Sequence, residues 1–249
     1  PIKRAIQKYL TNELSVQILS GKVDRVDVFR DGVDDERNYA YVERIVKTLL
    51  WAYGGYRIVV AGSKPLYERL REPRPALICV SGADWNDDFT PWPAPSVFRG
   101  RADFGGDADA FLKRLTEDIL PEAEAALPVA PKRRMLAGYS LAGLFAMYAA
   151  GMGAFDDAAS VSGSMWYESF LPWLEKAPAA PRRAYFSVGE REKEGRNHAF
   201  RTIEDCTRRA AEILHARGAQ TIFERNPGGH FDDPTGRMAR AIEWLIHCK

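Results

Sequence analysis

The chain has 249 residues, of which 46% are hydrophobic, so it is long enough to bury a substantial core. Its 35 Lys and Arg residues balance 34 Asp and Glu residues, and neither sign is gathered into a long block. This balance gives no reason to expect nucleic acid or an anionic membrane surface as a partner.

The three cysteines, Cys79, Cys206 and Cys248, are an odd number with no CxxC spacing. This usage argues against a disulfide framework and against a zinc site, so we expect a reducing compartment and a cytoplasmic protein. The longest apolar runs, such as residues 76–80, are far shorter than the roughly 20 residues of a membrane helix. No charged-then-apolar segment of the signal type opens the chain, and we expect no membrane association.

The N-terminal third alternates between strand and helix patterns. Residue spacing and turn signals predict strands over 24–29, 56–61 and 76–81, a helix over 42–53 that Gly54-Gly55 ends, and a short helix over 65–71. Such alternation favours a parallel sheet covered by helices on both faces.

The rest of the chain continues the same alternation after an irregular stretch over 83–106, which is rich in Pro, Gly, Asp and aromatic residues and which we expect to be an ordered, functional loop. The patterns predict helices over 108–120, 141–150, 200–214 and 238–245, strands over 133–137, 158–161, 184–188 and 221–224, and a loop or small cap over 163–181. We therefore expect a three-layer α/β fold with a mostly parallel central sheet. We expect one domain over 1–249, with 1–72 an atypical N-terminal portion and 73–249 the core.

Ser140 lies between the strand predicted over 133–137 and the helix predicted over 141–150. A serine nucleophile needs an exposed oxygen, a base to take its proton and donors for the oxyanion. A sharp strand-to-helix turn exposes the serine, and it requires small neighbours, which Gly138, Ala142 and Gly143 provide. The backbone N–H of Leu141, in the first helical turn, is then the expected oxyanion donor. Alternatively, the small residues only pack the helix on the strand.

Four segments resemble the putative-esterase group of α/β-hydrolases, which includes enterochelin esterases, esterase D and feruloyl esterases. The resemblance rests on Gly105 to Leu112, Ile119-Leu120-Pro121, Ala137 to Tyr148 and Ala159 to Trp166, and it covers roughly residues 75–247. It implies an α/β-hydrolase fold and ester hydrolysis. It also implies antiparallel strands at the start of the core, where this sequence predicts a strand-helix-strand unit. Alanine at position 142 departs from the GxSxG form of many such turns.

His230 is the expected general base because it lies in a glycine-bearing loop after the last predicted strand, and the order in this fold is Ser, acid, His. The resemblance implies the same, since a PGxHF-like segment recurs in these esterases. His198 is the alternative. His215, near a helix end, is expected to be solvated or to interact with the helix dipole, and His247 lies two residues from the C-terminus.

The triad acid is expected after the strand predicted over 184–188, where the loop offers three carboxylates. Glu192, a few residues beyond Gly189, is favoured, with Glu190 as the alternative and Glu194 less favoured. The acid holds the imidazole in its correct tautomer, a task that Glu performs as Asp does. Alternatively, the whole charged run is a solvated loop.

The second oxyanion donor is expected from a backbone amide after an earlier central strand, and Ser63, Lys64, Ala83 and Asp84 all remain candidates. Large aromatic residues are expected to line an acyl or aryl pocket, with Trp85, Tyr139 and Trp166 as the candidates. Trp92 and Trp173 belong to the same aromatic group. The alternative is that many of these side chains belong to the core.

We therefore expect a serine esterase that cleaves a small-molecule carboxylic ester through an acyl-enzyme, using Ser140, His230 and Glu192, with no metal and no cofactor. Two alternatives remain. An acyltransferase uses the same triad with an alcohol in place of water, and a non-catalytic binding module keeps the fold without the chemistry. No oligomeric state is predicted.

Overall fold

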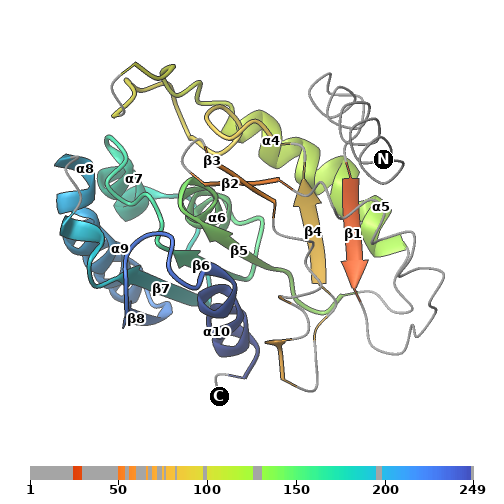
Figure 1. Ribbon diagram of the computed structural model, residues 1–249. Helices are drawn as coiled ribbons and strands as arrows, with labels where there is room; N and C mark the ends of the chain where they lie inside the picture. Colours follow the sequence, from red (N-terminus) through yellow and green to blue (C-terminus); the bar gives the residue numbers. More distant parts are fainter. Residues whose placement is uncertain are drawn as a thin grey trace, which may run out of the picture. The chain divides into compact units, whose positions relative to one another are not determined.

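The computed structural model (Figure 1) describes residues 25–29, 50–53, 56–59, 66, 69–71, 75, 77–81, 83–97, 100–125, 131–194 and 198–247. The chain divides into two compact units, Pro1–Ala83 and Asp84–Lys249. The expectation of one domain over 1–249 stays a prediction. No helix in the described ranges is both long enough and apolar enough to cross a membrane.

The N-terminal unit contains four described strands in two antiparallel pairs. Strand β1 (Arg25–Phe29) pairs with β4 (Leu77–Ser81), and β2 (Leu50–Tyr53) pairs with β3 (Tyr56–Val59). The parallel pairing expected for this part of the chain is therefore wrong. The antiparallel start that the resemblance implied is the arrangement found.

The helix predicted over 42–53 is wrong in its last four residues, which form β2. Residues 42–49 lie outside the described part. Tyr53 pairs with Tyr56, so only the Gly54-Gly55 dipeptide separates the paired strands. A Gly-Gly pair is favoured in two-residue hairpin connections, and aromatic residues such as Trp51 and Tyr53 favour strands.

The second unit is built on a parallel sheet of four strands in sequential order, β5 (Met135–Tyr139), β6 (Asp157–Val161), β7 (Arg183–Gly189) and β8 (Gln220–Asn226), as Figure 1 shows. All three neighbouring pairs are parallel. The predicted α/β class with a mostly parallel sheet is confirmed. Each of the four predicted strands is present, with ends displaced by at most two residues.

Helices cover both faces of this sheet. Helix α6 (Leu141–Gly151) connects β5 to β6, and α9 (Ile203–Ala216) connects β7 to β8, so right-handed crossovers place both on one face. Helix α10 (Pro234–His247) contacts β5, β6 and β7. Tyr185 of β7 packs on Trp244 of α10, and side chains alternate along a strand, so α10 covers the opposite face.

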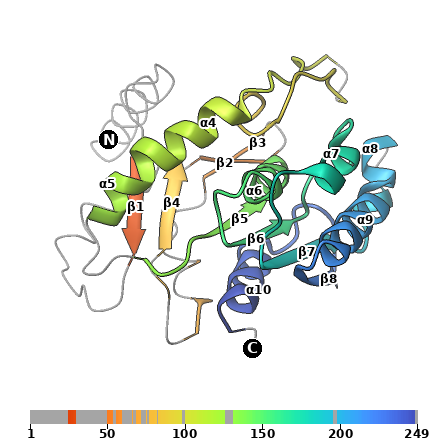
Figure 2. The ribbon, with the colours of Figure 1, turned by 180° about the vertical axis from the view of Figure 1, so that it is seen from behind.

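The remaining helices complete the unit. Two helices, α4 (Ala108–Arg114) and α5 (Leu120–Ala125), are joined by a π-helical turn, Leu115–Ile119, just before Pro121, which has no N–H to donate to the preceding turn. Helix α7 (Phe170–Lys176) lies within the segment expected to be a loop or cap, and it contacts α9 (Figure 2). A 3₁₀ turn, η2 (Glu192–Glu194), and α8 (His198–Arg201) follow β7.

The end of β5 and the start of α6 approach so closely that position 138 has no room for a side chain. A Cβ at Gly138 would collide with the carbonyl group of Ala142 in the first turn of α6. A Cβ at Gly143 would come within 2.8 Å of the Ser160 Oγ on β6. The glycines therefore set how near the helix lies to the sheet.

We expect Gly138→Ala to lower the free energy of unfolding by about 1–3 kcal/mol, because its methyl group would collide with backbone that cannot move aside cheaply. Urea unfolding of the two proteins measures the difference. Gly229→Ala is the matched control, since its methyl would meet nothing nearer than the Asp232 carboxylate at 3.8 Å. An equal loss of stability in both variants would contradict the packing argument.

Candidate active site

Ser140 occupies a strained backbone conformation between β5 and α6, with φ 58° and ψ −122°. Such a conformation costs on the order of 1–3 kcal/mol for a residue with a side chain, so the surroundings must hold it. The Ser140 N–H donates to the Val161 carbonyl at 3.0 Å, and the Ser140 carbonyl accepts from the N–H groups of Gly143, Leu144 and Ser164 at 3.0–3.1 Å. The serine is thus fixed where a parallel sheet collects functional side chains.

Leu141, the first residue of α6, has its backbone N–H at the N-terminus of the helix. Within the described part of the chain, no hydrogen-bond acceptor contacts this N–H. Unpaired amides at a helix N-terminus favour negative charge nearby. The amide next to Ser140 can therefore stabilise an oxyanion.

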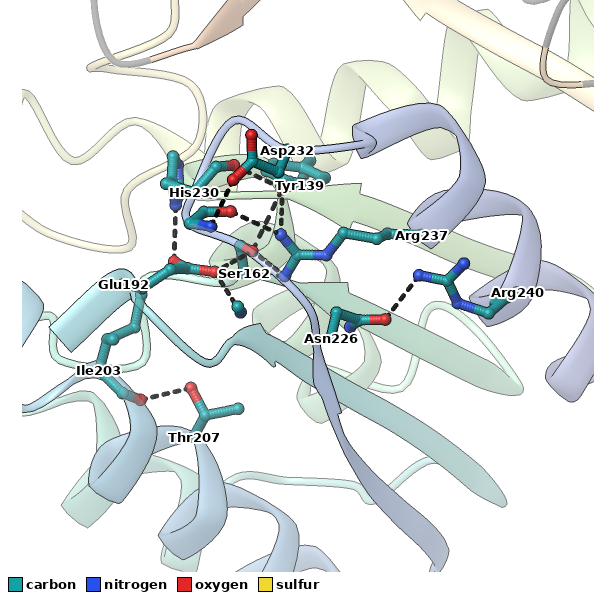
Figure 3. Close-up of polar contacts among 12 residues, drawn as sticks. Tyr139, Ser162, Glu192, Ile203, Thr207, Asn226, His230, Asp232, Arg237 and Arg240 are labelled. Atoms are coloured by element: carbon teal, nitrogen blue, oxygen red, sulfur yellow. Dashed lines mark hydrogen bonds and ion pairs between the residues drawn. The ribbon is translucent and has the colours of Figure 1, made fainter. Parts of the chain in front are cut away.

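His230 and Glu192 form a partly buried contact. The His230 Nδ1 lies 2.8 Å from the Glu192 Oε2, and their side chains are 11% and 0% exposed (Figure 3). His230 belongs to the loop between β8 and α10, and Glu192 begins the 3₁₀ turn after β7. Two residues that are 38 positions apart are brought together at one edge of the sheet.

The other carboxylate oxygen of Glu192 is surrounded by donors. Oε1 accepts from the Gly189 N–H at 2.5 Å and from the Ser162 hydroxyl at 2.6 Å, and it lies 3.2 Å from the Arg237 guanidinium. Burial alone would raise the pKa of Glu192. The hydrogen bond and charge of His230, with the Ser162 and Gly189 donors, outweigh burial and lower this pKa to about 2.

The competing acids and bases are placed differently. Glu190 and Glu194 are exposed, as are His215 and His247. His198 begins α8, and its side chain lies outside the described part of the structure. The described contacts therefore bring together Glu192 and His230 from the predicted acids and bases.

Tyr139, directly before Ser140, is fully buried, which differs from the pocket position expected from the sequence. Its hydroxyl donates to the His230 carbonyl at 2.6 Å, and its ring lies edge-on to the imidazole at 5.6 Å between centroids. Burial raises the pKa of Tyr139 to about 12, so the hydroxyl remains a donor at neutral pH. Tyr139 thus ties the His230 loop to the strand that carries Ser140.

The other predicted pocket aromatics take two different positions. Trp85 packs edge-on against Phe89 at 5.2 Å, and Phe89 contacts Phe111 of α4. Trp166 lies 6.5 Å from Phe200, whose ring is 5.9 Å from that of His230. Trp166 is therefore connected to the imidazole through one ring, whereas Trp85 belongs to a cluster around α4.

Of the four candidates for the second oxyanion donor, the structure argues against Asp84. The Asp84 N–H donates to the Asp88 carboxylate at 2.8 Å, so this amide is engaged within its own loop. Ser63 and Lys64 lie outside the described residues. Ala83 ends the N-terminal unit and stays a prediction.

Arg237 and Ser162 also belong to the site, although neither was predicted to. The Arg237 guanidinium is 1% exposed and donates to both the Ser162 Oγ and the Tyr139 hydroxyl. One sequence signal was present, because Arg237 lies four residues before Ala241 on the apolar face of the last helix.

Among the described residues, no group of three or more His, Cys, Asp or Glu side chains is arranged to hold a metal ion.

The parallel sheet, the strained serine between strand and helix, and the buried carboxylate–imidazole contact define an enzyme core of the α/β-hydrolase type. A family model described as "Putative esterase" matches residues 39–232, more than half of the chain. The chain therefore belongs to this esterase family and is a carboxylic ester hydrolase.

A curated relative, the uncharacterized protein YbbA of Bacillus subtilis (strain 168), is 27% identical over 190 residues, which cover 72% of this chain and 76% of YbbA.

Solved structures share the fold. The siderophore hydrolase EstA from Aspergillus nidulans is 20% identical with a TM-score of 0.58, covering 73% of this chain and 77% of its own. An IroE-like serine hydrolase from Shewanella oneidensis is 16% identical with a TM-score of 0.60, and the match covers 84% of this chain and 67% of the hydrolase. The enterobactin esterase FES from Shigella flexneri, solved in the presence of enterobactin, is 17% identical with a TM-score of 0.58. The match covers 90% of this chain and 56% of the esterase.

We expect the stability difference between the wild type and Glu192→Gln to shrink as the pH falls. Because folding lowers the pKa of Glu192 from its ordinary value of 4.5 to about 2, the ionised carboxylate stabilises the folded state above pH 4.5. That contribution, on the order of 3 kcal/mol, is lost as the pH falls from there toward 2. Urea unfolding of both proteins between about pH 7 and pH 3 measures it. A difference that stays constant over this range would contradict the assignment.

Proposed function

We propose that the chain hydrolyses a small-molecule carboxylic ester through an acyl-enzyme. The Ser140 Oγ attacks the ester carbonyl carbon while the His230 Nε2 takes the hydroxyl proton. The Leu141 N–H donates to the oxyanion of the tetrahedral intermediate. The C–O bond of the ester then breaks, and the imidazolium returns the proton to the leaving alcohol. Water, deprotonated by His230, releases the acid and restores the serine.

The observation that carries this proposal is the contact between His230 Nδ1 and the buried Glu192 Oε2 at 2.8 Å. It engages Nδ1 and so leaves proton transfer to Nε2. The hydrogen bond from Tyr139 to the His230 carbonyl supports the pairing of this base with Ser140, because Tyr139 is the residue before the serine.

The charge on Glu192 supports the same mechanism. Its low pKa keeps the carboxylate ionised at neutral pH, where it favours the imidazolium that forms when Ser140 loses its proton. The strain at Ser140 supports the role of nucleophile, since strained backbone conformations cluster at functional sites.

The names of the structural relatives support a small-molecule ester as the substrate class, because they include siderophore hydrolases and an enterobactin esterase. The ring of Phe231 lies edge-on to the imidazole at 4.9 Å and is 50% exposed, which supplies an apolar surface beside the base. We therefore propose aryl and short-chain acyl esters of p-nitrophenol as the first substrates to be tested.

We expect Ser140→Ala to lower kcat on such esters by at least about 10⁴-fold and to abolish labelling by a fluorophosphonate probe, because the attacking oxygen is removed. His230→Ala is expected to lower kcat to a similar extent. Ester hydrolysis and in-gel fluorescence measure the two effects.

Ser160→Ala is the matched control. Ser160 is a buried serine on the neighbouring strand β6, and its Oγ has no hydrogen-bond partner among the described residues. We expect this variant to be labelled and to turn over esters as the wild type does. Labelling that persists in Ser140→Ala would refute the assignment of the nucleophile.

A further inference from the structure

The Arg237 guanidinium lies at the centre of a buried hydrogen-bond network that reaches both the proposed acid and the proposed base (Figure 3). One branch passes from Nη2 to the Ser162 Oγ, and the Ser162 hydroxyl donates to Glu192 at 2.6 Å. The other passes from Nη1 to the Tyr139 oxygen at 2.8 Å, and the Tyr139 hydroxyl donates to the His230 carbonyl. Nη1 also lies 3.3 Å from the Gly229 carbonyl in the His230 loop.

We propose that Arg237 is a positioning residue that fixes Glu192 and the His230 loop relative to each other and, by neutralising the buried carboxylate, sets the pH below which the base is protonated. This inference rests on the proposed function of Ser140, His230 and Glu192. It adds a residue that touches neither the substrate nor the reacting atoms.

The cost of burying Arg237 supports a role beyond stability. Its side chain is 1% exposed, and within the described residues its Nε has no hydrogen-bond partner. A buried ion pair is weak evidence for stability, because desolvation offsets much of the attraction. The hydrogen-bond geometry explains the burial of Arg237 better than stability does. Its two terminal nitrogens belong to two separate branches, one ending at the proposed acid and the other at the proposed base.

The pH effect follows from counting charges. With neutral His230, the buried group of Arg237, Glu192 and His230 carries one positive and one negative charge. A proton added to the imidazole places a second positive charge near the guanidinium, and a proton added to the carboxylate leaves the guanidinium charge unpaired. Removing the guanidinium removes this repulsion, so the acid–base pair binds its proton at a higher pH.

No other buried charge opposes this effect among the described residues that face the pair. Tyr139 is buried, and its raised pKa keeps it neutral. The described charged side chains on the adjoining segments are wholly or partly exposed; they are Glu190, Arg191, Lys193, Glu194, Arg201, Asp232, Asp233 and Arg240. Arg191 and Asp232 also pair with each other at 3.3 Å, which screens both. Arg237 is therefore the charge that dominates the pair.

The test is the pH profile of kcat/KM, whose acid limb reports ionisation of the base in the free enzyme. For Arg237→Met we expect this limb to move to higher pH by about one unit or more, with a lower kcat and a similar KM. Arg237→Lys retains the charge, so we expect its acid limb to stay near that of the wild type.

Tyr139→Phe tests the other branch without removing any charge. We expect kcat to fall by about 10-fold or more, because the His230 loop loses its tether, while KM and the acid limb stay in place. Tyr139→Phe also tests the positioning role if Arg237→Met fails to fold, as judged by circular dichroism and thermal unfolding. An unchanged kcat in Tyr139→Phe would overturn the positioning role.

Fluorophosphonate labelling separates this inference from the proposed function. If the wild type is not labelled on Ser140, both proposals fail. If the wild type is labelled and folded Arg237→Met keeps the wild-type acid limb, only the role of Arg237 is overturned.

Discussion

The close approach of α6 to the end of β5 is the constraint on which the site depends. The chain turns sharply over Ser140, and this turn leaves no room for a Cβ at Gly138 against the Ala142 carbonyl. Three amides converge on the Ser140 carbonyl and hold the positive-φ backbone conformation that this turn needs. The same turn leaves the Leu141 amide at the N-terminus of the helix. The geometry of Ser140 and that of the Leu141 amide, which we propose as an oxyanion donor, therefore come from one packing contact.

A second constraint joins the serine to residues that lie far along the chain. Tyr139 is bound by Arg237, 98 positions away, and its hydroxyl binds the His230 loop. Ser162 and Gly189, at the ends of β6 and β7, donate to Glu192. The carboxyl ends of three adjacent parallel strands thus contribute to holding one carboxylate and one imidazole. Helix α10 supplies the positive charge of Arg237, which balances the Glu192 carboxylate.

The three residues that we propose for the triad have local signals in the sequence. Ser140 stands between glycines at a strand-to-helix junction, and Glu192 and His230 each follow a predicted strand in the order of the fold. Arg237 carried a weaker signal, because a charged residue in the first turn of a helix is ordinarily solvated. Its buried place depends on partners in three other elements, which no local pattern encodes. The position of Tyr139 was missed for the same reason.

The N-terminal strands show the opposite failure, in which a local pattern favoured the wrong element. Residues 42–53 have helical spacing, yet Leu50–Tyr53 pairs with β3. A four-residue apolar segment fits a strand or a helix equally well, and pairing with a neighbour decides between them. The Asp84 amide is another such case, because its bond to Asp88 depends on a turn within the loop that composition alone did not reveal.

Mass spectrometry of a rapidly quenched reaction with an aryl ester would detect the proposed acyl-enzyme itself. Trypsin releases Ser140 within the single peptide from Met135 to Lys176, so fragmentation of that peptide locates any acyl group. We expect one acyl group on Ser140 that disappears as hydrolysis finishes. Turnover without an acylated peptide, or an acyl group on another residue that forms and decays at the rate of turnover, would contradict it.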